Sequence, residues 1–166
     1  YKVTGGLHGV GASVVNALSE WLEAEVSREG KTFHMEFERG KTVGTLKEMG
    51  KSSSEKKSGT KVTFKPDNQI FPEIDFKYEV LQKRARELAY LNEGLHIIIE
   101  DERSGKRDEF QYEKGLVEYV SFLNEGKEAT SPVVSFSKED PAQRLVVDVA
   151  MQYNDGYAET ILTFAN

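Results

Sequence analysis

The sequence predicts an α+β fold, in which hairpin-linked strands form sheets and a few helices cover them. Apolar residues recur at every second position in several stretches, which is typical of half-buried strands. In three other stretches they recur at three- and four-residue spacing, which indicates amphipathic helices. Short turn signals rich in Gly, Asn, Asp and Arg join neighbouring strand patterns, as expected for hairpins.

The first half of the chain predicts one helix followed by a meander of strands. A helix is expected over about 12–23, because four apolar side chains there fall at helical spacing, namely Val14, Leu18, Trp21 and Leu22. Strands are expected around 33–37, 43–46 and 62–64, with a turn at 38–41 and a stop at Pro66. The segment 51–58 lacks apolar residues, so we expect a mobile surface loop.

The second half predicts another helix over about 77–92, ended near Gly94. The nearly continuous apolar run 95–100 predicts a central strand, paired through a turn at 103–106 with a strand around 110–112. A shorter helix is expected over 116–123, and we place a domain boundary near Glu113. Strict alternation over 145–153 predicts a strand, and the turn signal at 154–156 predicts a returning strand with Ile161 and Phe164.

The composition fits a folded chain and narrows the class of protein. The 166 residues are 38% hydrophobic and 30% charged, and the length suits one domain or one domain plus part of another. No apolar run approaches the ~20 residues that span a bilayer, so no membrane contact is expected. The chain has no cysteine, which fits a cytoplasmic location. A net charge of -6 argues against a broad nucleic-acid surface.

Both ends of the chain look like cut ends. The first residue is Tyr1 rather than Met, and a glycine-rich element follows within four residues. The last residues, 160–166, have the pattern of a strand with nothing after it to pair with. We therefore expect an internal piece of a longer protein.

The strongest candidate for chemistry is the segment Gly5-Gly6-Leu7-His8-Gly9-Val10-Gly11, which leads into the first predicted helix. Its four glycines let the backbone adopt positive φ, and its N–H groups join those of the helix start to form an anion site. Phosphate is the natural ligand, although a purely structural turn remains open. The spacing matches neither the dinucleotide-binding motif nor the P-loop, so another fold is implied.

A few other residues are weaker candidates. Lys2 could add a positive charge beside the phosphates, and Tyr1 could stack on a base, although solvated surface is the more common role. The hydroxyl of Thr60 could reach a nucleobase from the start of its strand. We interpret His8 as structural rather than catalytic. The other two histidines have no second ligand at metal spacing, so no metal site and no catalytic residue are predicted.

A long contiguous match identifies a family. Residues 1–19 read YKVTGGLHGVGASVVNALS and resemble the lid end and glycine motif of bacterial DNA gyrase B subunits, which are type IIA topoisomerase subunits with a GHKL (Bergerat-fold) ATPase. The similarity continues through 58–64, 86–92 and 152–157, and so spans almost the whole chain. Thr4 stands where the family often has serine, which keeps the hydroxyl.

The resemblance implies a fold in two parts. Residues 1–113 resemble the C-terminal part of the GHKL α/β sandwich ATPase domain, with the lid end and a strand of the adenine pocket. Residues 114–166 resemble the N-terminal part of the ribosomal-S5-like transducer domain.

The resemblance also implies an ATP site. The lid residues would contact the nucleotide, the glycine loop would bind the β- and γ-phosphates, and a threonine would lie in the adenine pocket. The implied cofactor-binding residues are Tyr1, Lys2, Gly6, Leu7, His8, Gly9, Val10, Gly11 and Thr60. The family's water-activating glutamate, Mg²⁺-binding asparagine and adenine-reading aspartate lie upstream of Tyr1, and its γ-phosphate lysine lies beyond Asn166. We therefore expect no hydrolysis by the chain itself.

By resemblance, the parent protein uses ATP and Mg²⁺ to close a dimer of B subunits and pass one DNA duplex through another. Its partner would be the gyrase A subunit in an A2B2 heterotetramer, with DNA contacted mainly by other regions. One alternative is the B subunit of topoisomerase IV, or more distantly a mismatch-repair or chaperone relative. Another is a non-catalytic interaction module in which the glycine loop is only structural.

Overall fold

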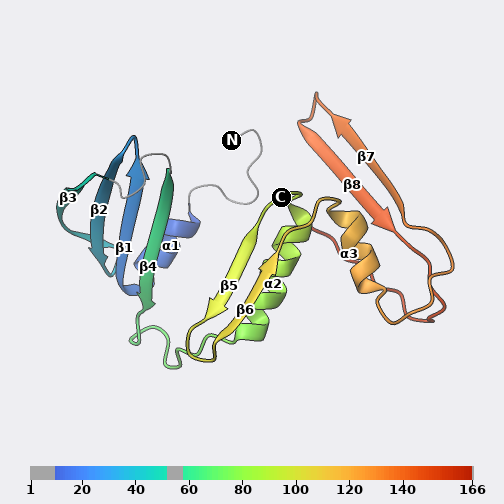
Figure 1. Cartoon of the computed structure of the whole chain (residues 1–166), viewed down its shortest axis with the longest axis horizontal. Coiled ribbons are helices and arrows are strands. Elements are labelled where there is room, and N and C mark those ends of the chain that lie inside the picture. The colour runs from blue at the N-terminus through green and yellow to red at the C-terminus, as the bar shows by residue number, and fades with distance from the viewer. Residues whose placement is uncertain (1–9, 52–57, 166) are drawn as a thin grey trace. The chain divides into compact units, whose positions relative to one another are not determined.

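The computed structural model describes residues 10–51 and 58–165 of the chain. The chain divides into two compact units, one formed by 1–75 with 163–166 and the other by 76–162. Helices and antiparallel sheets occur in both, which confirms the α+β prediction (Figure 1). Within the described residues no helix is both long enough and apolar enough to cross a membrane.

The first unit contains a four-stranded antiparallel sheet and one short helix. Its elements are α1 (Gly11–Ala17), β1 (Ser19–Arg28), β2 (Lys31–Glu38), β3 (Lys41–Lys51) and β4 (Gly59–Pro66). The strand order is β3-β2-β1-β4, so that β1 pairs with both β2 and β4 (Figure 1). The strands predicted around 33–37, 43–46 and 62–64 are confirmed.

The register places the apolar side chains of this sheet on one face. Leu22 lies opposite Phe37 on β2 and opposite Phe64 on β4, and it is buried. Residues that lie directly opposite on paired strands share a face, so this row marks the apolar side. Trp21, one residue earlier, lies opposite Glu38 and Lys65 and therefore belongs to the polar side.

The predicted turn at 38–41 is confirmed as a two-residue hairpin connection. Arg39 and Gly40 have φ of 46° and 79°, and positive φ at both central residues matches the right-handed twist of paired strands. A Cβ added at Gly40 would lie 3.2 Å from the Cα of Ala17. Glycine at this position therefore lets the hairpin approach the end of α1.

The predicted helix over 12–23 is wrong in its second half. The helix α1 ends at Ala17, and Trp21 and Leu22 lie in β1. The hydroxyl of Ser19 donates to the carbonyl of Val15 at 2.6 Å and so satisfies an acceptor near the helix end. From Leu22 onward apolar and polar residues alternate as in a strand. The pairing of β1 with a strand on each side outweighs the helical spacing of Trp21 and Leu22.

The second unit consists of a helix on a hairpin, then a second helix with a second hairpin. Its elements are α2 (Tyr78–Leu91), β5 (Ile97–Asp101), β6 (Lys106–Phe110), α3 (Leu116–Leu123), β7 (Val134–Asp140) and β8 (Leu145–Met151). The two predicted helices, the hairpin of β5 and β6 and the strand over 145–151 are confirmed (Figure 1).

Two predictions in this unit are wrong. The run 95–100 does not form a central strand, because β5 pairs with β6 alone among the described strands and Ile98 is 49% exposed. The returning strand with Ile161 and Phe164 is also absent from the described residues. The partner of β8 is instead the upstream strand β7, which the sequence analysis missed because its pattern is largely polar.

The turn signal at 154–156 folds back on an earlier loop. Asn154 forms an isolated antiparallel bridge with Ala129, and the amide of Asp155 donates to the carbonyl of Glu128 at 2.9 Å. The side chain of Asn154 also accepts a bond from the amide of Gly156 at 2.8 Å. These bonds hold residues 154–156 against the loop around residue 129.

The expected loop over 51–58 lies almost entirely outside the described residues. The domain boundary near Glu113 stays a prediction, because the compact unit 76–162 contains residues on both sides of it.

Candidate functional site

Three of the nine predicted nucleotide-binding residues lie among the described residues: Val10, Gly11 and Thr60. The other six, Tyr1, Lys2, Gly6, Leu7, His8 and Gly9, lie outside them. The arrangement of the glycine loop therefore stays a prediction, while the element that follows it can be described.

Gly11 is the first residue of α1, directly after Val10 at the N-cap. The carbonyl of Val10 accepts the amide of Val14 at 2.8 Å, and no described side chain caps this helix start. A Cβ added at Gly11 would meet no described atom within 4 Å, and its φ is not in the left-handed region. The described fold thus gives no packing reason for glycine at position 11.

Thr60 lies near the start of β4, opposite Val26 of β1. Among the described strands β4 pairs with β1 only, so Thr60 belongs to an edge strand, and its side chain is exposed. Val26 shares the apolar side of the sheet with Leu22, which places the Thr60 hydroxyl on that side too.

The register shows how Thr60 relates to α1. The helix leads into β1 at Ser19, which pairs with Pro66 at the other end of β4. Val26 is seven residues further along β1, a distance of roughly 23 Å at ~3.3 Å per residue. The described part of the chain therefore does not bring Thr60 and the end of α1 together, although both belong to one unit.

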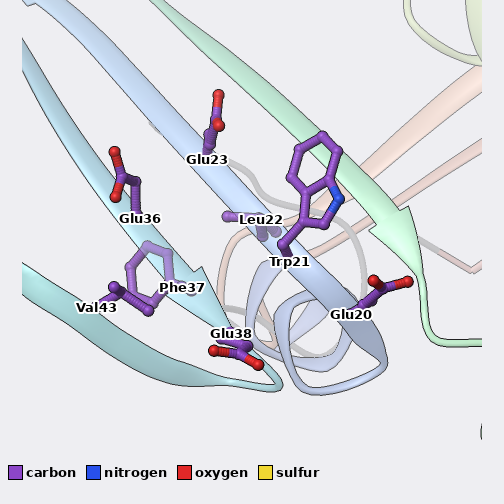
Figure 2. Close-up of a pocket in the computed structure, with 8 residues that line it drawn as sticks. All are labelled: Glu20, Trp21, Leu22, Glu23, Glu36, Phe37, Glu38 and Val43. Atoms are coloured by element: carbon purple, nitrogen blue, oxygen red, sulfur yellow. The ribbon is translucent and has the colours of Figure 1, made fainter.

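An open pocket of about 240 Å³ lies at the ends of β1, β2 and β3 (Figure 2). It is lined by Glu20, Trp21, Leu22, Glu23, Glu36, Phe37, Glu38 and Val43. Its four carboxylates would repel a polyphosphate, and none of the predicted site residues lines it. No cluster of His, Cys, Asp or Glu that could hold a metal ion occurs among the residues that the structure describes.

The histidine on β2 makes a local contact with a carboxylate of the same strand. Nε2 of His34 lies 3.0 Å from Oε1 of Glu36. That hydrogen bond, together with the charge of Lys47, lowers the pKa of the Glu36 carboxyl.

A buried carboxylate anchors the end of β4. Asp67 is 2% exposed and accepts hydrogen bonds from the Nε of Arg39 at 2.7 Å and from the amide of Gln69 at 2.9 Å. These two bonds lower the pKa of the Asp67 carboxyl. The pair ties the turn between β2 and β3 to the end of β4, a contact that sequence analysis missed because it joins positions 28 residues apart.

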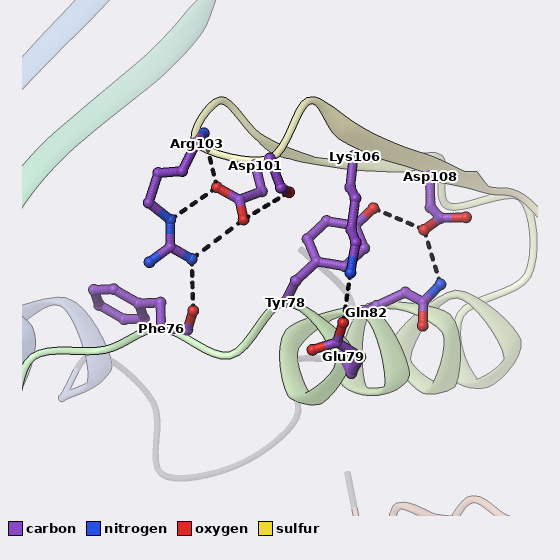
Figure 3. Close-up of polar contacts among 9 residues, drawn as sticks. Phe76, Tyr78, Glu79, Gln82, Asp101, Arg103, Lys106 and Asp108 are labelled. Carbon is purple, nitrogen blue, oxygen red and sulfur yellow. Dashed lines mark hydrogen bonds and ion pairs between the residues drawn. The ribbon is translucent and has the colours of Figure 1, made fainter.

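Hydrogen bonds and an ion pair hold the start of α2 on β6 (Figure 3). The Tyr78 hydroxyl donates to Oδ2 of Asp108 at 2.7 Å, and Nε2 of Gln82 donates to the same oxygen at 2.8 Å. Burial, followed by the bond to Asp108, raises the pKa of Tyr78 to about 12. The Nζ of Lys106 adds an ion pair of 2.7 Å with Glu79.

The turn between β5 and β6 is tied to the segment before α2 (Figure 3). The Nε of Arg103 lies 2.9 Å from Oδ1 of Asp101, and its Nη2 donates to the carbonyl of Phe76 at 2.7 Å. The bonds that Asp101 accepts, first of all from Arg103, lower its pKa to about 2. The hairpin and the start of α2 are therefore fixed together by charged contacts.

The end of α2 contacts α3 through stacked aromatic rings and one guanidinium that lies over two rings. We call this group the aromatic clasp. Its members are Arg86, Tyr90, Tyr112, Tyr119 and Phe122. The Tyr90 ring stacks on Tyr112 with centroids 3.6 Å apart and on Tyr119 with centroids 4.8 Å apart. Burial and a hydrogen bond with Tyr112 raise the pKa of Tyr90 well above its usual range.

Comparisons with known proteins agree with the resemblance seen in the sequence. The family model for DNA gyrase B matches residues 115–166. The whole chain is 50% identical to the B subunit of DNA topoisomerase 4 from Enterococcus faecalis and 51% identical to that from Staphylococcus aureus. The Streptococcus pneumoniae protein of the same name is 48% identical, again over the whole chain. The chain spans about a quarter of the length of these relatives.

A solved structure is similar over most of the chain. It is the 43K ATPase domain of Thermus thermophilus gyrase B, in complex with an aminocoumarin. The TM-score is 0.80 at 37% sequence identity, and the match covers 91% of this chain and 41% of the other. Similarity of this extent shows that the fold is shared.

Proposed function

The chain belongs to the family of type II topoisomerase B subunits, and from this premise we propose that it is a segment of an ATP-driven enzyme that passes one DNA duplex through another. The observation that carries the proposal is identity of about 50% to topoisomerase B subunits along the full chain. An interaction module with a merely structural glycine loop would not require such similarity to ATPase subunits.

In this proposal the loop before α1 binds the β- and γ-phosphates of ATP. Four glycines in seven residues, and a helix start that no described side chain caps, would supply amide donors for an anion. Gly11 supports this role, because the described fold gives no other reason for the absence of a side chain there. Tyr1 and Lys2 would close over the nucleotide from the lid, and Thr60 would contact the adenine.

The chain would combine the end of one domain with the start of the next. We assign 1–113 to the GHKL ATPase domain and 114–166 to the transducer domain. The start of the family-model match at residue 115 supports this assignment. ATP would favour the closed subunit dimer only if ATP binds that state more tightly than ADP does. We assign this difference in affinity to the contacts with the γ-phosphate.

The remaining chemistry would come from residues outside this chain. The water-activating glutamate and the asparagine that holds Mg²⁺ are expected upstream of Tyr1, so the chain alone should not hydrolyse ATP. The proposed setting is a cytoplasmic complex with the A subunit, in which other regions make most of the DNA contacts.

Two members of the family remain as alternatives, DNA gyrase and topoisomerase IV. The relatives at 48–51% identity are topoisomerase IV subunits, whereas the similar solved structure, at 37% identity, is a gyrase B. The family model carries the name of gyrase B. Incubation of the complete enzyme with relaxed plasmid and ATP separates them, because only a gyrase would introduce negative supercoils.

Binding of a labelled non-hydrolysable ATP analogue tests the proposed site. The protein is the chain extended upstream to its natural start, compared with its Gly9→Val and Gly126→Ala variants. Loss of one amide contact at ~0.3–1 kcal/mol weakens binding by roughly 2- to 5-fold, so Gly9→Val should weaken binding by at least this factor. Gly126 lies far along the chain from the loop, so Gly126→Ala should bind normally. Unchanged affinity of Gly9→Val would remove the phosphate role from this loop.

A further inference from the structure

The polar side of the four-stranded sheet holds an open tryptophan among carboxylates. On β1, Trp21 and Glu23 are two residues apart and therefore point to the same side of the sheet. On β2, Glu38 lies opposite Trp21, and Glu36 lies opposite Glu23. All four side chains line the open pocket at the ends of β1, β2 and β3 (Figure 2). We call this group of four residues the acidic tryptophan patch.

Glu23 and Glu36 form a like-charged pair across the two strands. Side chains directly opposite each other in an antiparallel pair have Cβ atoms ~4.5–5.5 Å apart, so two carboxylates at such positions destabilise the sheet. On its other side Glu23 lies opposite Thr63 of β4, which carries no charge. In the part of the chain that the structure describes, no cation contacts the Glu23 side chain. A positive charge between Glu23 and Glu36 would remove this repulsion.

The carboxylates in and beside the patch outnumber the lysine and arginine side chains that contact them. The carboxylates are Glu20, Glu23, Glu36, Glu38 and Asp67, and the cations are Arg39, Lys47 and Lys65. Arg39 lies 2.7 Å from Asp67 but 3.4 Å from Glu38, so its charge mainly neutralises Asp67. Nε2 of His34 adds a contact of 3.0 Å to Glu36. The patch therefore keeps an excess of negative charge.

Trp21 is a second, independent feature that favours a cation. It is the only tryptophan of the chain, and it is 36% exposed. Within the described residues no aromatic ring or cation is stacked on it. The face of an indole attracts a guanidinium or an ammonium group more strongly than other aromatic rings do. Arginine fits both features, because its planar guanidinium can stack on the ring and also form two parallel hydrogen bonds to a carboxylate.

We propose that the acidic tryptophan patch is a docking surface for an extended, arginine-bearing segment of a partner protein. One guanidinium stacks on Trp21 and bonds to Glu38, and a second lies between Glu23 and Glu36. These two places are two residues apart along the strands, roughly 6.6 Å at ~3.3 Å per residue, which is the spacing of alternate side chains in an extended peptide. A nucleic acid does not fit, because its phosphates would meet carboxylates. The inference is independent of the proposed ATP site.

The test measures how tightly the complete protein binds two dye-labelled peptides of eight residues, by fluorescence anisotropy. One peptide alternates arginine with threonine, and the other alternates lysine with threonine. Trp21→Leu removes the indole face, and Glu23→Gln removes one carboxylate of the like-charged pair. Glu139→Gln is the matched control, because it removes the same charge from an exposed strand position in the other unit.

The unchanged protein should bind the arginine peptide more tightly than the lysine peptide. Trp21→Leu and Glu23→Gln should each weaken binding of the arginine peptide by about 2- to 5-fold, and Trp21→Leu should also remove the preference for arginine. Glu139→Gln should bind like the unchanged protein. Equal weakening in Glu23→Gln and Glu139→Gln would mean that the peptide senses only the overall charge, and this would overturn the docking surface. Equal affinity of the unchanged protein for both peptides would overturn it too.

A second measurement separates docking from a structural role of Glu23. Loss of the repulsion between Glu23 and Glu36 should leave the free sheet at least as stable, so amides of β1 and β2 should exchange with solvent no faster in Glu23→Gln than in the unchanged protein. Affinity for the arginine peptide should nevertheless fall. Faster exchange in Glu23→Gln would show that this carboxylate stabilises the sheet, and would contradict the proposal. Glu23→Gln thus tests the docking surface even if Trp21→Leu loosens the fold.

Discussion

Replacement of Gly115 by alanine should destabilise the junction of α2 and α3 more than the same replacement at Gly126. Gly115 has φ 46° and ψ -117°, a backbone region essentially restricted to glycine, so alanine there costs ~1–3 kcal/mol. The new Cβ would also lie 2.8 Å from Cγ and Oε1 of Glu93, which must leave its rotamer at a cost of ~0.5–1.5 kcal/mol. The total is roughly 2–4 kcal/mol.

Gly126 provides the matched control. Its φ is 80°, but a Cβ there would meet no described atom within 4 Å, so alanine costs only the ~1–2 kcal/mol of a left-handed residue. The expected difference between the two variants is ~1–2 kcal/mol, which is a factor of about 5–30 in an opening equilibrium.

Amide hydrogen exchange of α3 measures this difference directly. The reporter is the Tyr119 amide, which donates to the Gly115 carbonyl at 3.1 Å. It should exchange about 5–30 times faster in Gly115→Ala than in Gly126→Ala. The fluorescence of Trp21, the only tryptophan, reports on the other unit and should not change.

A double variant separates the two costs. Glu93→Ala combined with Gly115→Ala removes the side-chain overlap and leaves the backbone strain, so it should recover ~0.5–1.5 kcal/mol. Equal exchange rates in Gly115→Ala and Gly126→Ala would refute the close approach of this segment to α2. A double variant that is less stable than Gly115→Ala alone would also refute this close approach.

Three further predictions concern the second unit. Tyr90→Ala should cost ~3–5 kcal/mol in a urea melt, whereas Tyr157→Ala should stay within ~0.5 kcal/mol of the unchanged chain; equal effects would contradict the buried clasp. The pKa of Asp101 is lowered from 3.8 to about 2. The ionised carboxylate therefore stabilises the folded chain above pH 3.8, and this stabilisation is lost as the pH falls through about 2. Urea midpoints measured from pH 5 to 2 should fall less steeply in Asp101→Asn, and identical profiles would count against the Arg103 contact. Tyr78 has its pKa raised from 10.0 to about 12, so stability should decline as the pH rises between these values. Tyr78→Phe should reduce that decline, which absorbance of tyrosinate and near-ultraviolet circular dichroism can follow.

The sequence predicted those helices and strands whose local apolar pattern agrees with the contacts that they make in the folded chain. α2 is confirmed within one residue at each end, because its amphipathic spacing and the Gly94 stop indicate the same boundaries. The Arg39-Gly40 turn was predictable because a two-residue connection between strands favours glycine.

The errors arose where tertiary pairing decides between two local patterns. Trp21 and Leu22 fit the end of a helix by spacing, but pairing of β1 with β2 and β4 makes them strand residues. The polar alternation of β7 gave no signal, and its existence depends on β8 as a partner. Local spacing contains no information on such partners.

The candidate site was predictable in a different way. The glycine loop is contiguous, so both its chemistry and its family resemblance could be recognised from residues 5–11. Asp67 and the aromatic clasp could not, because their partners lie from 22 to 36 positions away along the chain and become neighbours only in the folded chain.

The most direct test of the central claim is a titration of backbone amide chemical shifts with a non-hydrolysable ATP analogue. The protein is the chain extended upstream to its natural start, with adenosine alone as the comparison ligand. Binding of the polyphosphate by the loop predicts large shifts at the amides of Gly6, Gly9 and Gly11 with the analogue and small ones with adenosine. Amides of this loop that do not respond to the analogue, while others in the protein do, would contradict the account.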